Sequence, residues 1–126
     1  MTDMLPGGDG GDCFEVAYVL AASQNAIRGP LDPTWYVCHG EPIGRGRLNN
    51  GVRFAHAWVE TTDVNGVPAV LDWSNGHQMT CSKDDYYRLG QIGEENVKRY
   101  SATEAVLLLA LTGHYGPWHK AGMDAA

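Results

Sequence analysis

The stretch VRFAHAWVETTDVNGVPAVL, residues 52–71, predicts a β-hairpin in the middle of the chain. Residues 52–61 are rich in β-branched and aromatic side chains, and residues 67–71 form a second apolar run of strand character. Asn65-Gly66 stands between the two runs, and this dipeptide is typical of tight hairpin turns. The two segments therefore predict neighbouring antiparallel strands.

A helix is predicted on the N-terminal side of this hairpin. Residues 13–26 carry a dense apolar set without Pro or Gly, and Asp12 is a suitable N-cap. Apolar residues occupy most sides of the helix, which predicts a central and largely buried position. Between this helix and the hairpin, residues 34–38 predict a short strand and residues 40–51 a glycine-rich loop.

Three more elements are predicted after the hairpin. Residues 82–89 favour a short helix and residues 96–100 another strand. Ser101 and Glu104 match a capping box, which predicts a last helix ending near Leu111. The order of a helix, several antiparallel strands and two further helices indicates an α+β domain.

Length and composition limit the class of protein. The 126 residues suit a single domain spanning 1–126, in which the glycine-bearing residues 1–11 form an irregular lead-in. A formal net charge of -6, with cations scattered along the chain, argues against nucleic-acid binding. No apolar run reaches the roughly 20 residues of a membrane span, and no secretion signal is recognisable. Because three widely separated cysteines make a poor disulfide framework, we expect a reduced, cytoplasmic protein with no membrane partner.

Three residues could together perform nucleophilic catalysis. Cys13 opens the first predicted helix, where the helix dipole favours a thiolate and backbone N–H groups can bind an oxyanion. His56 lies between two alanines in a strand and can carry a proton to and from a thiol. Asp72 follows the returning apolar run, where it can orient the imidazole. Each residue alone is explained by ordinary packing or capping, but the three together indicate acyl transfer.

The segments around these residues resemble the motifs of the transglutaminase-like superfamily of cysteine enzymes. They are GDCFEVA at residues 11–17, HAWVE at residues 56–60 and LDWS at residues 71–74. The resemblance implies a papain-like core, in which the helix that carries the cysteine packs on an antiparallel sheet. It also implies Cys13 as nucleophile, His56 as base and Asp72 as orienter. The resemblance covers about residues 10–75, and residues 80–118 match no element of the family.

Whether Asp72 faces His56 depends on the hairpin loop. Directly opposed residues of a hairpin share a face of the sheet. A regular two-residue turn at Asn65-Gly66 would place Asn75 opposite His56 and turn Asp72 to the other face. A three-residue loop or one bulge would return Asp72 to the face of His56. We favour Asp72 as the orienter with an irregular hairpin, and Asn75 is the alternative.

Other residues are weaker candidates for the site. Trp58, Trp73 and Asn75 are expected to contact substrate, although large aromatic side chains more often belong to a core. The remaining cysteines and histidines lack the paired spacing of a zinc site, so neither a metal nor another cofactor is expected.

The leading hypothesis is therefore a cysteine hydrolase or acyltransferase. Cys13 would attack an amide, isopeptide or thioester carbonyl of a peptide or protein substrate, and water or an amine would release the acyl group. Hydrolysis is the simpler expectation, because no site for an amine acceptor is recognisable. The alternative is a non-catalytic binding or inhibitor module that keeps the same fold.

Overall fold

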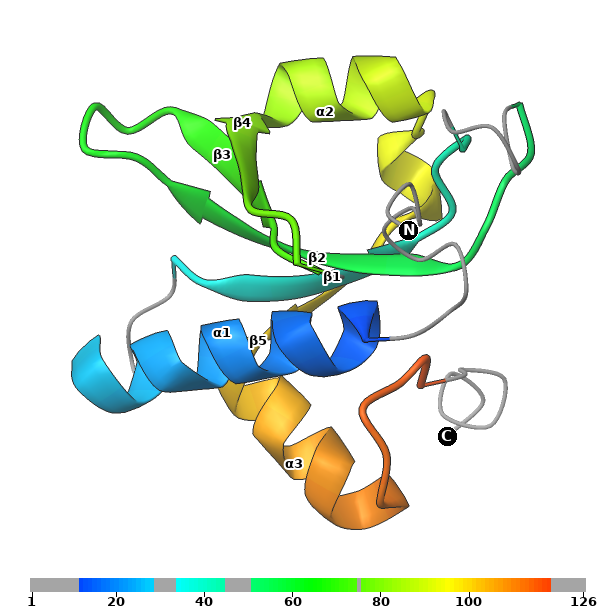
Figure 1. Ribbon diagram of the computed structural model, residues 1–126. Coiled ribbons are helices and arrows are strands. Elements are labelled where there is room, and N and C mark those ends of the chain that lie inside the picture. The colour runs from blue at the N-terminus through cyan, green and yellow to red at the C-terminus, as the bar shows by residue number, and fades with distance from the viewer. Residues whose placement is uncertain (1–11, 29–33, 45–50, 75, 119–126) are drawn as a thin grey trace.

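The computed structural model describes residues 12–28, 34–44, 51–74 and 76–118. Within these residues, a five-stranded antiparallel sheet packs with three α-helices (Figure 1). In chain order the elements are α1 (Cys13–Arg28), β1 (Tyr36–Gly40), β2 (His56–Thr62), β3 (Pro68–Asp72), β4 (Met79–Ser82), α2 (Lys83–Gly90), the 3-10 helix η1 (Glu94–Asn96), β5 (Lys98–Ser101) and α3 (Ala102–Thr112). The α+β class predicted from the sequence is confirmed.

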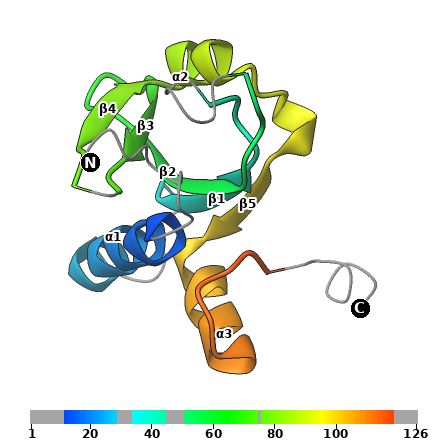
Figure 2. The same ribbon diagram turned by 45° about the vertical axis from the view of Figure 1, so that its right-hand side comes forward.

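The central strand of the sheet is β2, in the order β4-β3-β2-β1-β5. Helices α1 and α3 lie on one side of the sheet, and α2 lies on the other (Figure 2). The chain returns to the sheet after α2 and adds β5 beside β1, so the two halves of the sequence share one sheet. Segments far apart in the sequence therefore meet around β1 and β2.

Both faces of β2 are buried, and each face packs against a different part of the protein. Ala57 and Val59 join the apolar core between the sheet and α1. Because side chains alternate along a strand, His56, Trp58 and Glu60 point to the opposite face, on the side of α2. Because both faces of β2 are covered, its histidine and its glutamate lie in the protein interior. Each of these polar groups therefore needs a partner.

The hairpin between β2 and β3 has a three-residue loop. Asp63 N donates to Val67 O at 2.9 Å, which closes a loop of residues 64–66. Gly66 has a φ of 81°, the left-handed conformation that completes a hairpin of this length. In the resulting register Val59 pairs with Leu71, which puts Asp72 opposite Trp58. This is the irregular hairpin that the sequence analysis favoured, and it places Asp72 on the face of the sheet that carries His56.

Local signals in the sequence predict the ends of the helices well. α1 begins at Cys13 as expected. The capping box of α3 is present in both directions, because Ser101 Oγ accepts from Glu104 N while the Glu104 carboxylate accepts from Ser101 N. The helix ends at Thr112, and the residue that caps it, Gly113, has a φ of 79°, which is typical of a C-cap glycine.

The strands differ more from the prediction. The strand expected over residues 52–61 starts at His56, since Arg53 makes only an isolated bridge to Ile43. β4 was not predicted, because MTCS is a short and mostly exposed edge strand without an apolar alternation. None of the described helices is long and apolar enough to cross a membrane. The lead-in predicted at residues 1–11 lies outside the described residues.

Candidate active site

Cys13 occupies the first position of α1, and its side chain is buried. The first intrahelical hydrogen bond runs from Val16 N to Asp12 O, at 2.8 Å. The backbone N–H groups of residues 13–15 therefore precede the i to i−4 ladder of α1, at the positive end of the helix dipole. This end of α1 lies beside the start of β2 (Figure 1), which brings the thiol near His56.

His56 connects a carboxylate to this thiol. It is the first residue of β2 and 1% exposed, and its Nε2 lies 2.8 Å from Asp72 Oδ2. The other ring nitrogen, Nδ1, is buried and has no hydrogen bond of regular geometry among the described residues. Cys13 nevertheless acts on the ring through hydrogen bonding and charge. Since Nε2 is engaged by Asp72, we infer that the sulfur lies on the side of Nδ1.

The protonated form of His56 is strongly favoured. Burial by itself disfavours the imidazolium and lowers the pKa of His56, as expected for a cation taken out of water. The hydrogen bonds to Asp72 and to Cys13, together with the charges of both, outweigh burial and raise the pKa of His56 to about 9. At neutral pH the ring is therefore an imidazolium between the carboxylate of Asp72 and the sulfur of Cys13.

Asp72 is held by three donors. Its Oδ2 accepts from His56 Nε2 and from the hydroxyl of Tyr86, the latter at 2.6 Å, and its Oδ1 accepts from Ser74 Oγ at 3.2 Å. Burial raises the pKa of Asp72, but these hydrogen bonds and the charge of His56 outweigh burial and lower it. A buried carboxylate satisfied in this way stays ionised and oriented.

Sequence reasoning did not find the roles of Tyr86 and Ser74. Ser74 stands in the LDWS segment, two residues after Asp72, so its proximity could have been noticed. Tyr86 comes from α2, where it is one of two aromatic residues in the run KDDYYRLG. Only the tertiary fold brings α2 over β3 and places this hydroxyl on Asp72.

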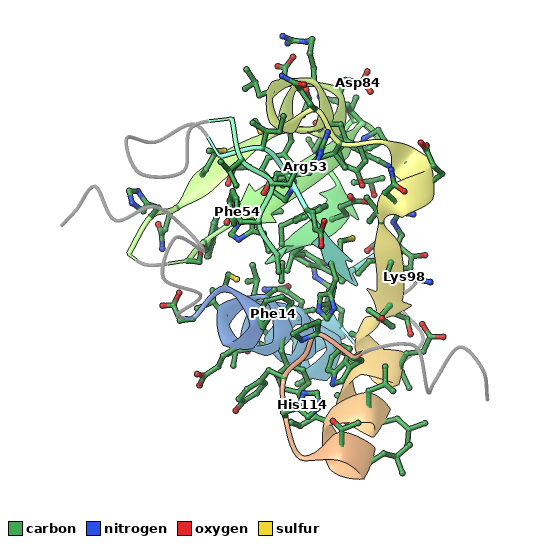
Figure 3. All side chains as sticks on the ribbon, turned by 90° about the vertical axis from the view of Figure 1, so that its right-hand side faces the viewer. Phe14, Arg53, Phe54, Asp84, Lys98 and His114 are labelled. Atoms are coloured by element: carbon green, nitrogen blue, oxygen red, sulfur yellow. The ribbon has the colours of Figure 1, made fainter. Side chains whose placement is uncertain are left out.

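A groove of about 730 Å³ reaches His56 at the start of β2. Its lining residues come from five parts of the chain, and Figure 3 shows Phe14 of α1, Arg53 before β2 and Lys98 of β5 around this region. An aromatic cluster forms part of its wall, made of Phe14, His39, Tyr100 and Trp118. The groove is large enough for several residues of an extended peptide, and its apolar wall suits an apolar side chain.

Two tryptophans predicted to contact substrate are not among the residues that line this groove. Trp58 is 1% exposed, packs on Tyr86 with ring centroids 5.2 Å apart and donates to Glu60. Trp73 is half-buried and its indole N–H donates to Thr80. Neither side chain lines the groove, so their contact with substrate stays a prediction that this geometry does not support. Asn75, the third such residue and the alternative orienter, lies outside the described residues.

The glutamate of the HAWVE motif has a structural partner set of its own. Glu60 is 5% exposed and accepts hydrogen bonds from Trp58, Arg99 and Tyr87. Burial raises the pKa of Glu60, but these donors outweigh burial and lower it. Because its partners come from β5 and α2 as well as β2, Glu60 connects these three elements. It does not line the groove beside His56.

No metal centre is formed by the described residues. Among them, no three His, Cys, Asp or Glu side chains gather as a metal would require. The described cysteines, Cys13, Cys38 and Cys81, are all free thiols.

Comparisons with known proteins identified no relative of this chain. Neither a family model, nor a curated protein, nor a solved structure gives a significant match to the chain. The function is therefore inferred from the residues and their geometry.

Proposed function

We propose that this protein is a thiol-dependent hydrolase or acyltransferase of the transglutaminase-like type. Its core would be papain-like, with the helix that carries Cys13 packed on the antiparallel sheet. The observation that carries the proposal is the position of His56. Its Nε2 binds Asp72, and Cys13 helps to raise the pKa of the same ring through hydrogen bonding and charge. A nucleophile, a proton carrier and an orienting carboxylate in contact are the parts that acyl transfer requires.

The first half of the proposed reaction forms an acyl-enzyme. In the proposed resting pair of thiolate and imidazolium, the thiolate of Cys13 attacks the substrate carbonyl carbon, a C–S bond forms, and the carbonyl electrons move to oxygen. In this proposal, backbone N–H groups at the start of α1 donate to this oxyanion. His56, protonated at neutral pH because its pKa is about 9, gives its Nδ1 proton to the leaving amine or thiol as that bond breaks.

The second half returns the free enzyme. Now neutral, His56 accepts a proton from a water molecule, whose oxygen attacks the thioester carbonyl. The C–S bond breaks, the carboxylic acid leaves, and the thiolate of Cys13 again faces an imidazolium. An amine in place of water would give a transferase. Hydrolysis is the proposed outcome, because no acceptor site for an amine is recognisable in the residues that line the groove.

The proposed substrate is a peptide or protein lying in the groove beside His56. Amide and isopeptide carbonyls are the chemical class that this machinery attacks, and thioesters react by the same route. A mechanism that needs a reduced thiol also fits three free cysteines, and we place the protein in the reducing cytoplasm.

One observation favours a second candidate function, a non-catalytic binding module. The side chain of Cys13 is only 1% exposed, so a carbonyl can reach the sulfur only after local rearrangement. A buried cysteine with a histidine partner is also compatible with a core that has kept the fold without turnover.

Selective alkylation separates the two candidates. Accessibility alone predicts that iodoacetamide modifies Cys81 first, because Cys13 and Cys38 are buried and Cys81 is partly exposed. A catalytic Cys13 reverses this order at pH 6, where ordinary thiols are largely protonated and burial raises the pKa of Cys81 further. Peptide mass analysis measures the rate at each cysteine.

The matched control is His56→Gln, which should slow the labelling of Cys13 and leave that of Cys81 unchanged. Turnover of a panel of peptide amides and acyl esters by the native protein, and its loss in Cys13→Ala, would complete the case. Labelling of Cys81 ahead of Cys13 at pH 6 would overturn the proposed enzyme and favour the binding module.

A further inference from the structure

We propose that Tyr86 is a positioning residue for the Cys13–His56–Asp72 site, where it fixes the orientation of the Asp72 carboxylate. The inference rests on the proposed function and extends the site into α2, a part of the chain that the family resemblance does not cover. Tyr86 touches neither the substrate groove nor the sulfur among the contacts described. Its action is therefore through Asp72.

The contact between Tyr86 and Asp72 is short and enclosed. The hydroxyl of Tyr86 donates to Oδ2 at 2.6 Å, the oxygen that also accepts from His56 at 2.8 Å. Tyr86 is 8% exposed and its ring packs on Trp58. A hydrogen bond from a neutral donor to a carboxylate is strong when water is excluded.

In this hydrogen bond Tyr86 is always the donor and Asp72 the acceptor. Burial, followed by the charge of Asp72, raises the pKa of Tyr86 far above its ordinary value, so the phenol keeps its proton. The other titratable groups whose charges reach this pair are His56 of β2, Cys81 of β4 and Cys13 of α1. None of these groups replaces Tyr86 as a neutral donor to Oδ2.

Two neutral hydroxyls therefore fix the carboxylate. Ser74 donates to Oδ1 from the segment that follows β3, and Tyr86 donates to Oδ2 from α2. A carboxylate bound at both oxygens cannot rotate about its Cβ–Cγ bond without losing both donors. This restraint keeps Oδ2 in the position that binds His56 Nε2, and thereby keeps the other side of the ring directed at Cys13.

The neighbouring tyrosine supplies a matched control. Tyr87 also belongs to α2 and also donates its hydroxyl to a buried carboxylate, but that carboxylate is Glu60. Tyr86→Phe and Tyr87→Phe each remove one hydroxyl from the same helix, and Tyr87→Phe also removes the hydrogen bond that Arg99 donates to that hydroxyl. Only the first removes a donor from Asp72.

The test measures how fast iodoacetamide modifies Cys13 from pH 3 to pH 9 in both variants. Without Tyr86 the ionised form of Asp72 loses a donor, so Tyr86→Phe should move the acid limb of the profile upward by about one to two pH units. Tyr87→Phe should leave the limb within a few tenths of a unit. Carbon NMR of the Asp72 carboxyl should show the same upward shift in Tyr86→Phe without reference to reactivity.

A double-mutant cycle decides whether Tyr86 acts through Asp72. In an Asp72→Asn background, Tyr86→Phe should no longer change the Cys13 profile, whereas a merely structural effect would persist. Equal profiles for native protein and Tyr86→Phe, with Cys13 reactive in both, would overturn the positioning role and leave the proposed function intact. Slow labelling of Cys13 in the native protein would instead overturn the proposed function and the positioning role with it.

Discussion

The pKa of His56 is the quantity on which the site most directly depends. Replacing Asp72 by Asn keeps the size of the side chain and its capacity to accept from Tyr86, but removes the negative charge. Burial then opposes the imidazolium without its main compensation. We expect the pKa of His56 to fall from about 9 to its ordinary value of 6.5 or below.

The size of this effect follows from the shift. A fall of at least about two pH units corresponds to roughly 3 kcal/mol of lost stabilisation of the imidazolium, at 1.36 kcal/mol per unit. At pH 7.5 the imidazolium fraction would drop from nearly complete to about a tenth, since the ring then titrates one unit below the working pH. The labelling of Cys13 at that pH should fall by a similar factor.

Proton NMR of the histidine rings measures the titration directly. The chain has five histidines, and the His56 signals are assigned as those that disappear in His56→Gln. Glu60→Gln is the matched control. It neutralises a buried carboxylate that lies on the same strand as His56 but contacts Arg99 instead of His56. A His56 that still titrates near pH 9 in Asp72→Asn would refute the ion pair, as would an equal shift in Glu60→Gln.

Three further predictions concern stability. The pKa of His56 is raised on folding, so its contribution to the free energy of unfolding should be complete below pH 6.5 and disappear as pH rises through about 9. The pKa of Asp72 is lowered on folding, so its contribution should be complete above pH 3.8 and be lost on further acidification. Urea unfolding across this range measures both limbs, and the alkaline limb should be absent in Asp72→Asn. Gly40→Ala should cost about 1–3 kcal/mol and lower the melting temperature, because a Cβ there would lie 2.7 Å from Trp58 Cη2 in the core; an unchanged melting temperature would contradict this packing. Gly66→Ala meets no atom within 4 Å but forces φ +81 on an alanine, so urea unfolding should show a loss of about 1 kcal/mol, and no loss would mean that the loop can adopt another turn.

The parts of the site that depend on local chemistry were predictable from the sequence. An apolar helix without Pro or Gly must begin near Asp12, and this places Cys13 at its positive end. The capping box at Ser101 and Glu104 fixes the start of α3 in the same way. These signals are readable because caps and turns are contacts between residues a few positions apart.

The orientation of Asp72 was not decided by local preference. Asn65-Gly66 is compatible with loops of two or three residues, and a change of one residue turns Asp72 to the other face of β3. The structure contains the three-residue loop, and the need to pair a buried carboxylate with His56 agrees with that choice. The sequence narrowed the orienter to two residues, and the register of the hairpin brought one of them to His56.

Contacts across the sheet were beyond the sequence altogether. Tyr86 reaches Asp72 from 14 positions away, and Arg99 reaches Glu60 from 39 positions away. The periodicity of the sequence does not reveal contacts between residues so far apart in the chain, because these contacts depend on how α2 and β5 pack once the sheet has formed. The chain determines by itself which residues can react, while packing of distant segments determines which of them touch.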